Sequence, residues 1–220
     1  MSFKNEKWDE LERLKEKFLT LDKQQIVPSR NREKIRILEK ILQLEPDEQY
    51  ALARKGEILY DMSECDASVE CFEQVLLINP ENMRAMYGKA ENLICLGELE
   101  EAVECYDEIS RMHEPPDELW LDRGWVLELL GRHQDAIKDY DFFMSLDPEN
   151  QNDFSVLERK IECLKLLGRK KEVKEFQKVV YGEGSQSSES FSKILHSLGI
   201  FGLSFGIAYV AVSFVIRIFF

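Results

Sequence analysis

Residue types that could catalyse a reaction or bind a metal occur in this sequence, but their spacing suits neither task. His113, His133 and His196 are scattered, so they lack the spacing of metal ligands or of a catalytic base with its orienting residue. The acidic run at residues 100–104 is typical of a solvated helix face. A glycine-rich phosphate loop and a nucleophile motif are both absent from the sequence. We therefore predict that the protein is not an enzyme and has no catalytic residues, no metal site and no cofactor.

The five cysteines carry no recognisable motif either. They are odd in number and form no CxxC pair, so they match neither a disulfide framework nor a zinc ribbon. Buried free thiols in a reducing compartment are the simplest interpretation. The positions are Cys65, Cys71, Cys95, Cys105 and Cys163.

Composition and charge narrow the choice of partner. The 220 residues are 44% hydrophobic and 32% charged, which is an ordinary balance for a globular protein. The net charge of −13 would repel a phosphate backbone, so nucleic acid is excluded as a partner. The excess of acid favours partners with basic or neutral surfaces.

A step of 34 residues organises most of the chain. Pro46 and Pro80 are 34 residues apart, and Pro148 follows Pro80 by twice that interval. Other residue types keep the same step, namely Gly97 with Gly131, Ala102 with Ala136, and Phe72 with Tyr106 and Tyr140. Periods of about 20–50 residues are the sequence signature of repeat architectures. The chain is therefore predicted to be an array of similar units.

Each unit has the pattern of two antiparallel helices, seen best in residues 116–148. Asp117 can cap a first helix, and Gly131 can supply the left-handed residue that ends it. The small residues Gly124 and Ala136 let the two helices approach closely. The first helix carries an apolar stripe of Trp120, Gly124, Leu127 and Leu130, and the second carries Ala136, Ile137, Tyr140, Phe143 and Met144.

These residues resemble the tetratricopeptide repeat family, whose pattern of aromatic, glycine, alanine and proline positions spans about 34 residues. The positions that carry the resemblance are Trp120, Gly124, Gly131, Ala136, Tyr140 and Pro148. The copy at residues 47–80 departs from the pattern, because Ser63 and Ser68 replace the expected glycine and alanine. The resemblance implies an all-α solenoid of antiparallel helical hairpins that forms a superhelix with a concave groove.

The repeat register predicts the domain organisation. Residues 1–46 form a divergent first hairpin with two apolar stripes, Trp8, Leu11, Leu14, Phe18 and Leu21, then Ile35, Leu38, Ile41 and Leu42. The array proper covers residues 47–181. Its units are three clear repeats at 47–80, 81–115 and 116–148 and a degenerate fourth at 149–181.

The resemblance also implies which residues bind a partner, because the first helix of each tetratricopeptide hairpin lines the groove. The groove positions are Tyr50, Arg54, Glu57, Arg84, Tyr87, Glu91, Glu118, Asp122, Trp125 and Glu128. Acids mixed with aromatic residues suit an extended peptide that carries Lys or Arg and an apolar anchor. A solvated inner face without a dedicated ligand is the alternative.

One known family role is excluded by the residues themselves. Co-chaperone members grip a carboxylate with Lys, Asn and Arg, but the matching positions here are neutral or acidic and would repel it. These positions are Ala53, Glu57, Gly88, Glu118 and Asp122.

The C-terminal region has a different composition from the array. Residues 182–192 are rich in Gly and Ser and read as a linker, and residues 193–220 as a transmembrane anchor. Leu198–Ile216 holds 19 residues without a charge, which is long enough to cross a lipid bilayer as a helix. A buried capping helix is the alternative. Gly202 and Gly206 match a small-residue pattern that permits helix pairing, so a weak homodimer is also predicted.

Together these features predict a single-pass integral membrane protein with its repeat array in the cytoplasm. Its function is that of a scaffold or adaptor whose groove recruits a protein or peptide. The alternative is a subunit, or an assembly, import or fission adaptor, of a membrane-embedded complex.

Overall fold

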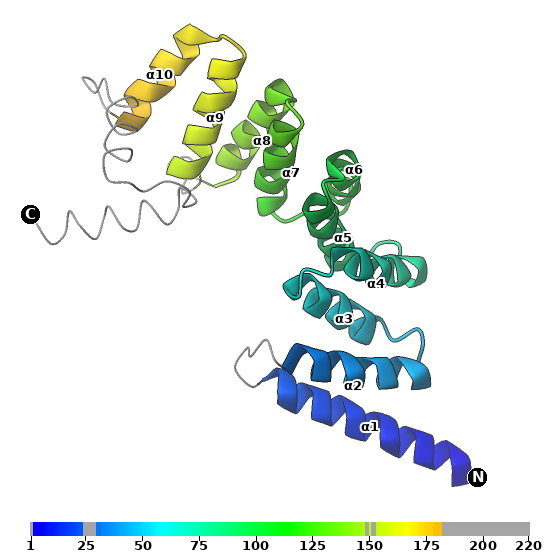
Figure 1. The fold of residues 1–220 in the computed structure, drawn as a ribbon. Coiled ribbons are helices and arrows are strands. Elements are labelled where there is room, and N and C mark those ends of the chain that lie inside the picture. Colours follow the sequence, from blue (N-terminus) through cyan, green and yellow to red (C-terminus); the bar gives the residue numbers. More distant parts are fainter. Residues whose placement is uncertain (1, 24–29, 148–149, 151–152, 182–220) are drawn as a thin grey trace, which may run out of the picture. The chain divides into compact units, whose positions relative to one another are not determined.

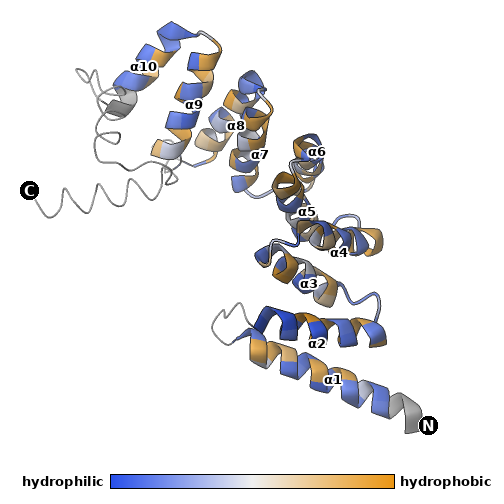
Figure 2. Cartoon of the chain, in the orientation of Figure 1, coloured by the Kyte–Doolittle hydropathy of each residue, from blue (hydrophilic) through white to orange (hydrophobic). Residues whose placement is uncertain are grey.

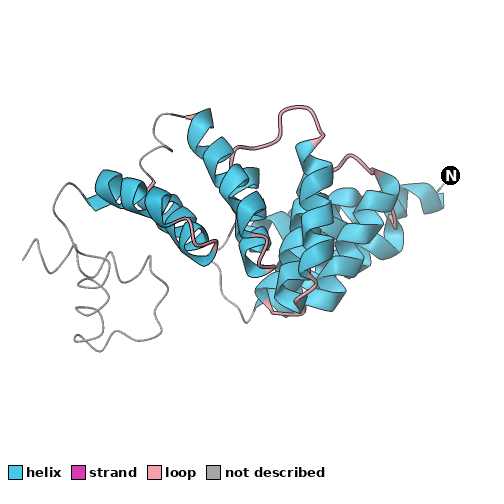
Figure 3. Cartoon of the chain, turned by 90° about the horizontal axis from the view of Figure 1, so that it is seen from above, coloured by secondary structure: helices cyan, strands magenta, loops and turns pink. Residues whose placement is uncertain are grey.

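The computed structural model describes residues 2–23, 30–147, 150 and 153–181. In this part of the chain the regular structure is helical throughout, with ten α-helices and no strand, which confirms the predicted all-α class (Figures 1 and 3). The helices are α1 (Ser2–Asp22), α2 (Asn31–Leu44), α3 (Gln49–Asp61), α4 (Cys65–Ile78), α5 (Met83–Leu96), α6 (Leu99–Ser110), α7 (Glu118–Leu129), α8 (His133–Leu146), α9 (Phe154–Leu166) and α10 (Lys170–Tyr181).

The chain forms two compact units, one ending at Gly131 and the other beginning at Arg132. In the first unit, each helix from α1 to α7 packs against the next along the chain, and α3 also contacts α5. The contact between α3 and α5 brings the first helices of two successive hairpins together. Figure 2 shows that α1 and α2 each carry both hydrophobic and hydrophilic residues, as expected for helices that bury one face.

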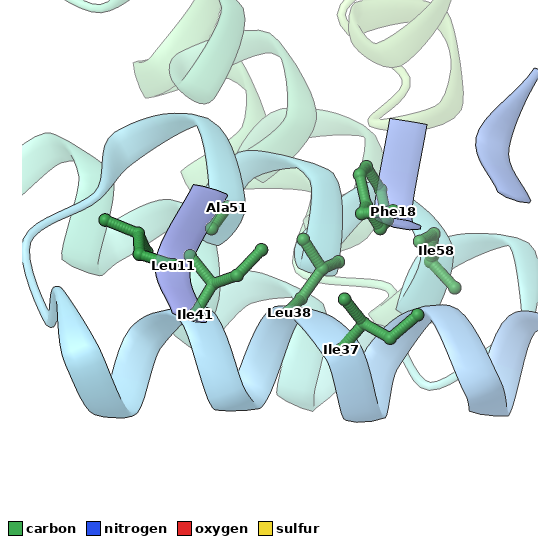
Figure 4. Close-up of a cluster of buried hydrophobic side chains, with 7 residues drawn as sticks. All are labelled: Leu11, Phe18, Ile37, Leu38, Ile41, Ala51 and Ile58. Atoms are coloured by element: carbon green, nitrogen blue, oxygen red, sulfur yellow. The ribbon is translucent and has the colours of Figure 1, made fainter. Parts of the chain in front are cut away.

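The N-terminal hairpin has its own core, which also includes residues of α3. Buried side chains of the three helices meet in one cluster, shown in Figure 4: Leu11, Phe18, Ile37, Leu38, Ile41, Ala51 and Ile58. The prediction was wrong for Trp8, which is 58% exposed. Lys15 pairs with Glu45, just beyond the end of α2, at 3.2 Å. The first turns of the longer helix α1 therefore extend past the end of α2, which leaves Trp8 exposed among the described residues.

Three glycines adopt the left-handed conformation in the turns that join the first and second helices of successive hairpins, and this was predicted for Gly131. The φ angles are +82° at Gly97, +73° at Gly131 and +70° at Gly168. Ser63 occupies the same place in the first repeat, one 34-residue step before Gly97, and has a φ of +60°. The turn keeps its shape although the residue there carries a Cβ, which costs free energy in this conformation.

Replacing Ser63 with glycine is expected to raise the free energy of unfolding by about 0.5–1 kcal/mol. Glycine removes the free-energy cost of a Cβ atom in the left-handed conformation. This gain exceeds the free-energy cost of the additional conformational entropy that glycine loses on folding. Urea denaturation followed by circular dichroism measures the change. The reverse substitution Gly97→Ser is the matched control and should be destabilising. An unchanged or lower stability of Ser63→Gly would contradict the strain assigned to this turn.

The second departure from the repeat pattern, Ser68, has a structural explanation. Its hydroxyl donates a hydrogen bond to the carbonyl oxygen of Gly56 at 2.7 Å, and the side chain is fully buried. This bond joins α4 to α3 at the positions equivalent to Ala136 and Gly124. Small residues at this crossing thus allow a side chain of one helix to reach the backbone of the other.

The predicted cap at Asp117 is not formed. Asp117 has helical backbone angles, φ −59° and ψ −37°, and its side chain makes no capping hydrogen bond. A capping residue needs extended backbone angles to turn its side chain back toward the first N–H groups. Asn82 and Asp153 have such angles, and each accepts hydrogen bonds from backbone N–H groups of the helix that follows it.

The expectation that all cysteines are free was also wrong. Cys65 and Cys95 are joined by a disulfide, while Cys71, Cys105 and Cys163 are free and buried. The bond connects residues 30 positions apart, at the beginning of α4 and near the end of α5. Sequence spacing did not reveal the pair because the two residues meet only when antiparallel helices of neighbouring hairpins pack together.

The described helices of the second unit are α8, α9 and α10, and α9 contacts both of the others. Lys160 of α9 is buried, and it forms an ion pair with Asp141 of α8. Its ammonium group also lies 3.7 Å from the ring centre of Phe176 in α10, so one cation links the three helices.

The predicted linker and transmembrane anchor, residues 182–220, lie outside the described residues. Among the helices that are described, none combines the length and the apolar character needed to cross a membrane.

Candidate partner-binding face

The ten predicted groove residues all lie in the first unit, on α3, α5 and α7. On each helix they are spaced three or four residues apart, so they share one side of that helix. We call this side of the three helices the recognition face. The structure divides its residues into an ion-pair network at the α3 end and an acidic group between α5 and α7.

The ion-pair network centres on Asp22, the last residue of α1. Asp22 accepts two hydrogen bonds from Arg54, at 2.8 and 2.7 Å, and one from Lys34 at 2.8 Å. Arg54 also pairs with Glu57, which in turn pairs with Arg84 of α5. Three predicted groove residues, Arg54, Glu57 and Arg84, are therefore engaged with one another and with the N-terminal hairpin.

Sequence reasoning missed Asp22 and Lys34 as part of this face. Partial burial by itself would raise the pKa of Asp22, but the hydrogen bonds from Lys34 and Arg54 outweigh it and lower the pKa. Asp22 lies 32 positions before Arg54, in a hairpin that departs from the repeat pattern. No motif relates the two residues, so only the packing of α1, α2 and α3 reveals the network.

Tyrosine side chains occupy the centre of the recognition face. The hydroxyl of Tyr87 on α5 donates a hydrogen bond to Oδ2 of Asp122 on α7, with an oxygen–oxygen distance of 3.4 Å. The ring of Tyr87 contacts the buried ring of Tyr106 edge to face, with centres 5.5 Å apart. Burial and the nearby carboxylates raise the pKa of Tyr87, so its hydroxyl stays protonated and remains a donor.

Three carboxylates surround this tyrosine without a cation to balance them. Desolvation raises the pKa of Glu91, and the neighbouring Asp122 and Glu57 raise it further. Desolvation also raises the pKa of Asp122, with Glu118 adding to it and the hydrogen bond from Tyr87 opposing it. Within the part of the chain that the structure describes, no Lys, Arg or His pairs with Glu91, Glu118 or Asp122. This face therefore concentrates unneutralised negative charge between α5 and α7.

The remaining predicted residues lie at the two ends of the face. Trp125 and Glu128 of α7 are half-buried. Tyr50 of α3 is 46% exposed, and its ring meets that of Phe18 edge to face at 6.4 Å. Tyr50 also borders a cavity of about 160 Å³, lined mainly by apolar side chains of α1, α2 and α3. The lining residues are Lys15, Phe18, Leu19, Leu38, Ile41, Glu48, Tyr50 and Ala51.

This arrangement of charges, rings and a cavity is suited to binding. No cluster of three or more His, Cys, Asp or Glu side chains with the geometry of a metal site occurs among the described residues. The face instead offers a negative centre beside aromatic rings, with an apolar cavity at one end. A negative centre beside aromatic rings is the kind of surface that suits a cationic group, and an apolar cavity suits an apolar side chain.

Solved structures of MamA proteins have a similar fold. The MamA RS-1 ArsTM double mutant gives a TM-score of 0.68 at 17% identity, covering 82% of this chain and 98% of that chain. MamA AMB-1 gives 0.66 at 17% identity, covering 83% and 97%. A MamA fragment beginning at residue 41, from Desulfovibrio magneticus RS-1, gives 0.61 at 19% identity, covering 72% and 88%. Identities this low show a shared fold only.

Sequence comparison finds a similarity to a known repeat family in the central part of the chain. No curated protein sequence matches the chain. The family model for the tetratricopeptide repeat matches residues 53–109 and, overlapping them, residues 91–141. These matches span α3 to α8 and include the 34-residue step described above. Over residues 53–141, this chain is therefore similar in sequence to tetratricopeptide repeats.

Proposed function

We propose that this protein is a scaffold that binds a partner protein through its recognition face and is anchored to a membrane by its C-terminal segment. The tetratricopeptide repeats and the MamA-like fold support a function in protein–protein interaction. The observation that carries the proposal is the unneutralised acidic group of Glu91, Glu118 and Asp122 beside Tyr87.

The partner in this proposal presents a Lys or Arg side chain to the acidic group. Desolvation first, and then the neighbouring carboxylates, raise the pKa values of Glu91 and Asp122, so the charged forms are disfavoured where they stand. A cation from the partner would relieve this repulsion, and the aromatic rings nearby would contact its alkyl chain. The cavity beside Tyr50 would take an apolar side chain of the same partner. The partner is thus a basic peptide segment with an apolar anchor.

The anchor in this proposal is the uncharged segment Leu198–Ile216, with the repeat array on the cytoplasmic side. Its test uses the full chain expressed in cells and separated into membrane and soluble fractions. The protein should remain with membranes after washing with carbonate at high pH, and a variant ending at residue 192 should not. Release of the full chain by carbonate would instead support a helix that caps the array.

Removing charge from the acidic group should weaken binding of a basic peptide by about tenfold, which corresponds to about 1.4 kcal/mol. The variant is Glu91→Gln with Asp122→Asn, which changes the charge and preserves the size of each side chain. Glu57 is left intact because its ion pairs hold the fold. The matched control is Glu100→Gln with Glu104→Gln, which removes the same charge from exposed positions of α6.

The probe is an array of short peptides that vary in Lys, Arg and Leu content, with hits measured by fluorescence anisotropy. Affinity should fall as salt rises and as pH falls toward the raised pKa values of Glu91 and Asp122, where the carboxylates lose their charge. Equal affinities for the acidic-group variant and the α6 control would place the binding site elsewhere on the protein.

A further inference from the structure

The Cys65–Cys95 disulfide joins two sulfur atoms in different surroundings. Cys65 is the first residue of α4 and is only 3% exposed. Cys95, in the last turn of α5, is exposed to solvent. A small thiol can therefore approach the bond at the sulfur of Cys95, whereas the fold covers Cys65.

We propose that Cys65 and Cys95 form a redox-active pair and that Cys95 is the site at which a small thiol attacks and is attached. The thiolate forms a bond to Sγ of Cys95, and the Cys65–Cys95 bond breaks with its electron pair passing to Cys65, which then takes up a proton. A second thiol attacks the mixed disulfide on its outer sulfur, so Cys95 leaves as a thiol. Two thiols are oxidised to one disulfide, and the protein gains two electrons and two protons.

The beginning of α4 favours this direction of attack. The sulfur that departs as an anion belongs to the first residue of the helix, where backbone N–H groups have no partner within the helix. The preceding residue, Glu64, makes no capping hydrogen bond that would occupy these groups. Negative charge on the departing sulfur of Cys65 is therefore stabilised by the helix N-terminus.

The other cysteines of this unit are poorly suited to exchange with the pair. Cys71 and Cys105 are buried, and desolvation raises the pKa of each thiol, to about 11 for Cys105. Their thiolate forms are scarce at neutral pH, and the thiolate is the attacking species. Exchange is thus confined to Cys65 and Cys95.

The charges near the pair select the kind of thiol. Glu64 and Asp66 flank Cys65, while Glu91 and Glu98 lie within four residues of Cys95. The nearest basic residue in sequence to Cys95 is Lys89, which pairs with Glu73 at 2.8 Å. An anionic thiol is repelled by this surface, so the preferred reagent is a neutral or cationic thiol.

Opening the bond releases a constraint between α4 and α5. The disulfide closes a segment 30 residues long, which stabilises the fold by restricting the unfolded chain. Disulfides in cytoplasmic proteins are usually transient and redox-sensing. A rise in the concentration of thiols would then open the Cys65–Cys95 bond and lower the stability of α5, the helix that carries Tyr87 and Glu91.

The first experiment counts thiols in the full-length protein after equilibration with a glutathione redox buffer and alkylation under denaturing conditions. In an oxidising glutathione buffer, mass spectrometry should find three alkylated cysteines, which are the three free residues. In a reducing glutathione buffer it should find five, because the two bonded residues are then also free. Reduction should also lower the melting temperature by several degrees and speed amide hydrogen exchange in α4 and α5. Five free thiols under oxidising buffer would overturn the proposal.

The second experiment tests the site and direction of attack with two matched variants. In Cys65→Ser the exposed Cys95 should take up one cysteamine per chain from its disulfide cystamine under native conditions. In Cys95→Ser the buried Cys65 should react at least tenfold more slowly. Reduction of the wild type should be fastest with cysteamine, slower with mercaptoethanol and slowest with mercaptoethanesulfonate, and high salt should narrow these differences. Equal labelling of the two variants, or no dependence on the charge of the thiol, would contradict Cys95 as the attacked atom.

Discussion

Replacing Gly88 with alanine should lower the free energy of unfolding by about 1–3 kcal/mol, although alanine is the better helix former. A Cβ atom at Gly88 would lie 2.4 Å from Cζ of Phe72 and within 2.7 Å of two further ring atoms. The ring is 1% exposed and also lies against Gly56 of α3, where an added Cβ would be 3.0 Å from Cζ. Because the buried ring touches both helices, the added methyl group must displace the ring or push α4 and α5 apart.

The matched control for this prediction is Gly56→Ala, whose contacts with Phe72 and Cys71 begin at 3.0 Å and need shifts of only a few tenths of an ångström. Its gain in helix propensity, about 1 kcal/mol, should offset most of the crowding. In the Phe72→Leu background, Gly88→Ala should become much less costly, because the smaller side chain leaves space for the Cβ. Chemical denaturation of the four proteins measures this coupling. Stabilisation by Gly88→Ala in the wild-type background would disprove the close contact.

Replacing Asp22 with alanine should cost about 2–3 kcal/mol, because it leaves the buried ammonium group of Lys34 without its acceptor and leaves Arg54 with Glu57 as its remaining partner. The side chain of Asp22 is 20% exposed, that of Lys34 is 9% exposed and that of Arg54 is 23% exposed. The control is Glu33→Ala, which breaks an exposed pair with Lys17 in the same hairpin and should cost less than about 0.5 kcal/mol. Urea denaturation at neutral pH compares the two variants.

The pH dependence of the stability difference between the wild type and Asp22→Ala tests whether the charge of the Asp22 carboxylate causes it. The pKa of Asp22 is lowered below its usual value of 3.8 in the folded protein, so its stabilisation is fully present above that value. It is lost as the pH falls through the lowered pKa, where the carboxylate is protonated. The stabilities of the wild type and Asp22→Ala should therefore converge in strong acid. A difference that stays constant down to pH ~2 would mean that packing, and not charge, is responsible.

Phe72 and Asp22 show the difference between a position that a repeat pattern predicts and a contact that only packing reveals. Phe72 was recognisable from the sequence, because Tyr106 and Tyr140 follow it at the 34-residue step. Its close contacts with Gly56 and Gly88 could not be predicted, because a repeat pattern gives positions along one unit and not distances between two units. Asp22 belongs to the hairpin that departs from the pattern, so the repeat gave no register for it.

The amino-acid pattern alone predicted the helical hairpins and their turns, and it set the ten proposed groove residues along one side of each first helix. Periodicity suffices for this, because helix spacing and the need of left-handed turns for small residues are local properties, as Gly97 and Gly131 show. Which of the proposed groove residues neutralise one another depends on how the helices pack, and the pattern does not contain this. Arg54 forms ion pairs with Asp22 and Glu57, and Glu57 also pairs with Arg84. By contrast, no cation pairs with Glu91 or Asp122 among the described residues. The disulfide of Cys65 and Cys95 was likewise decided by packing. Ion pairing and disulfide bonding depend on distances between separate helices, and those distances are set when the helices pack.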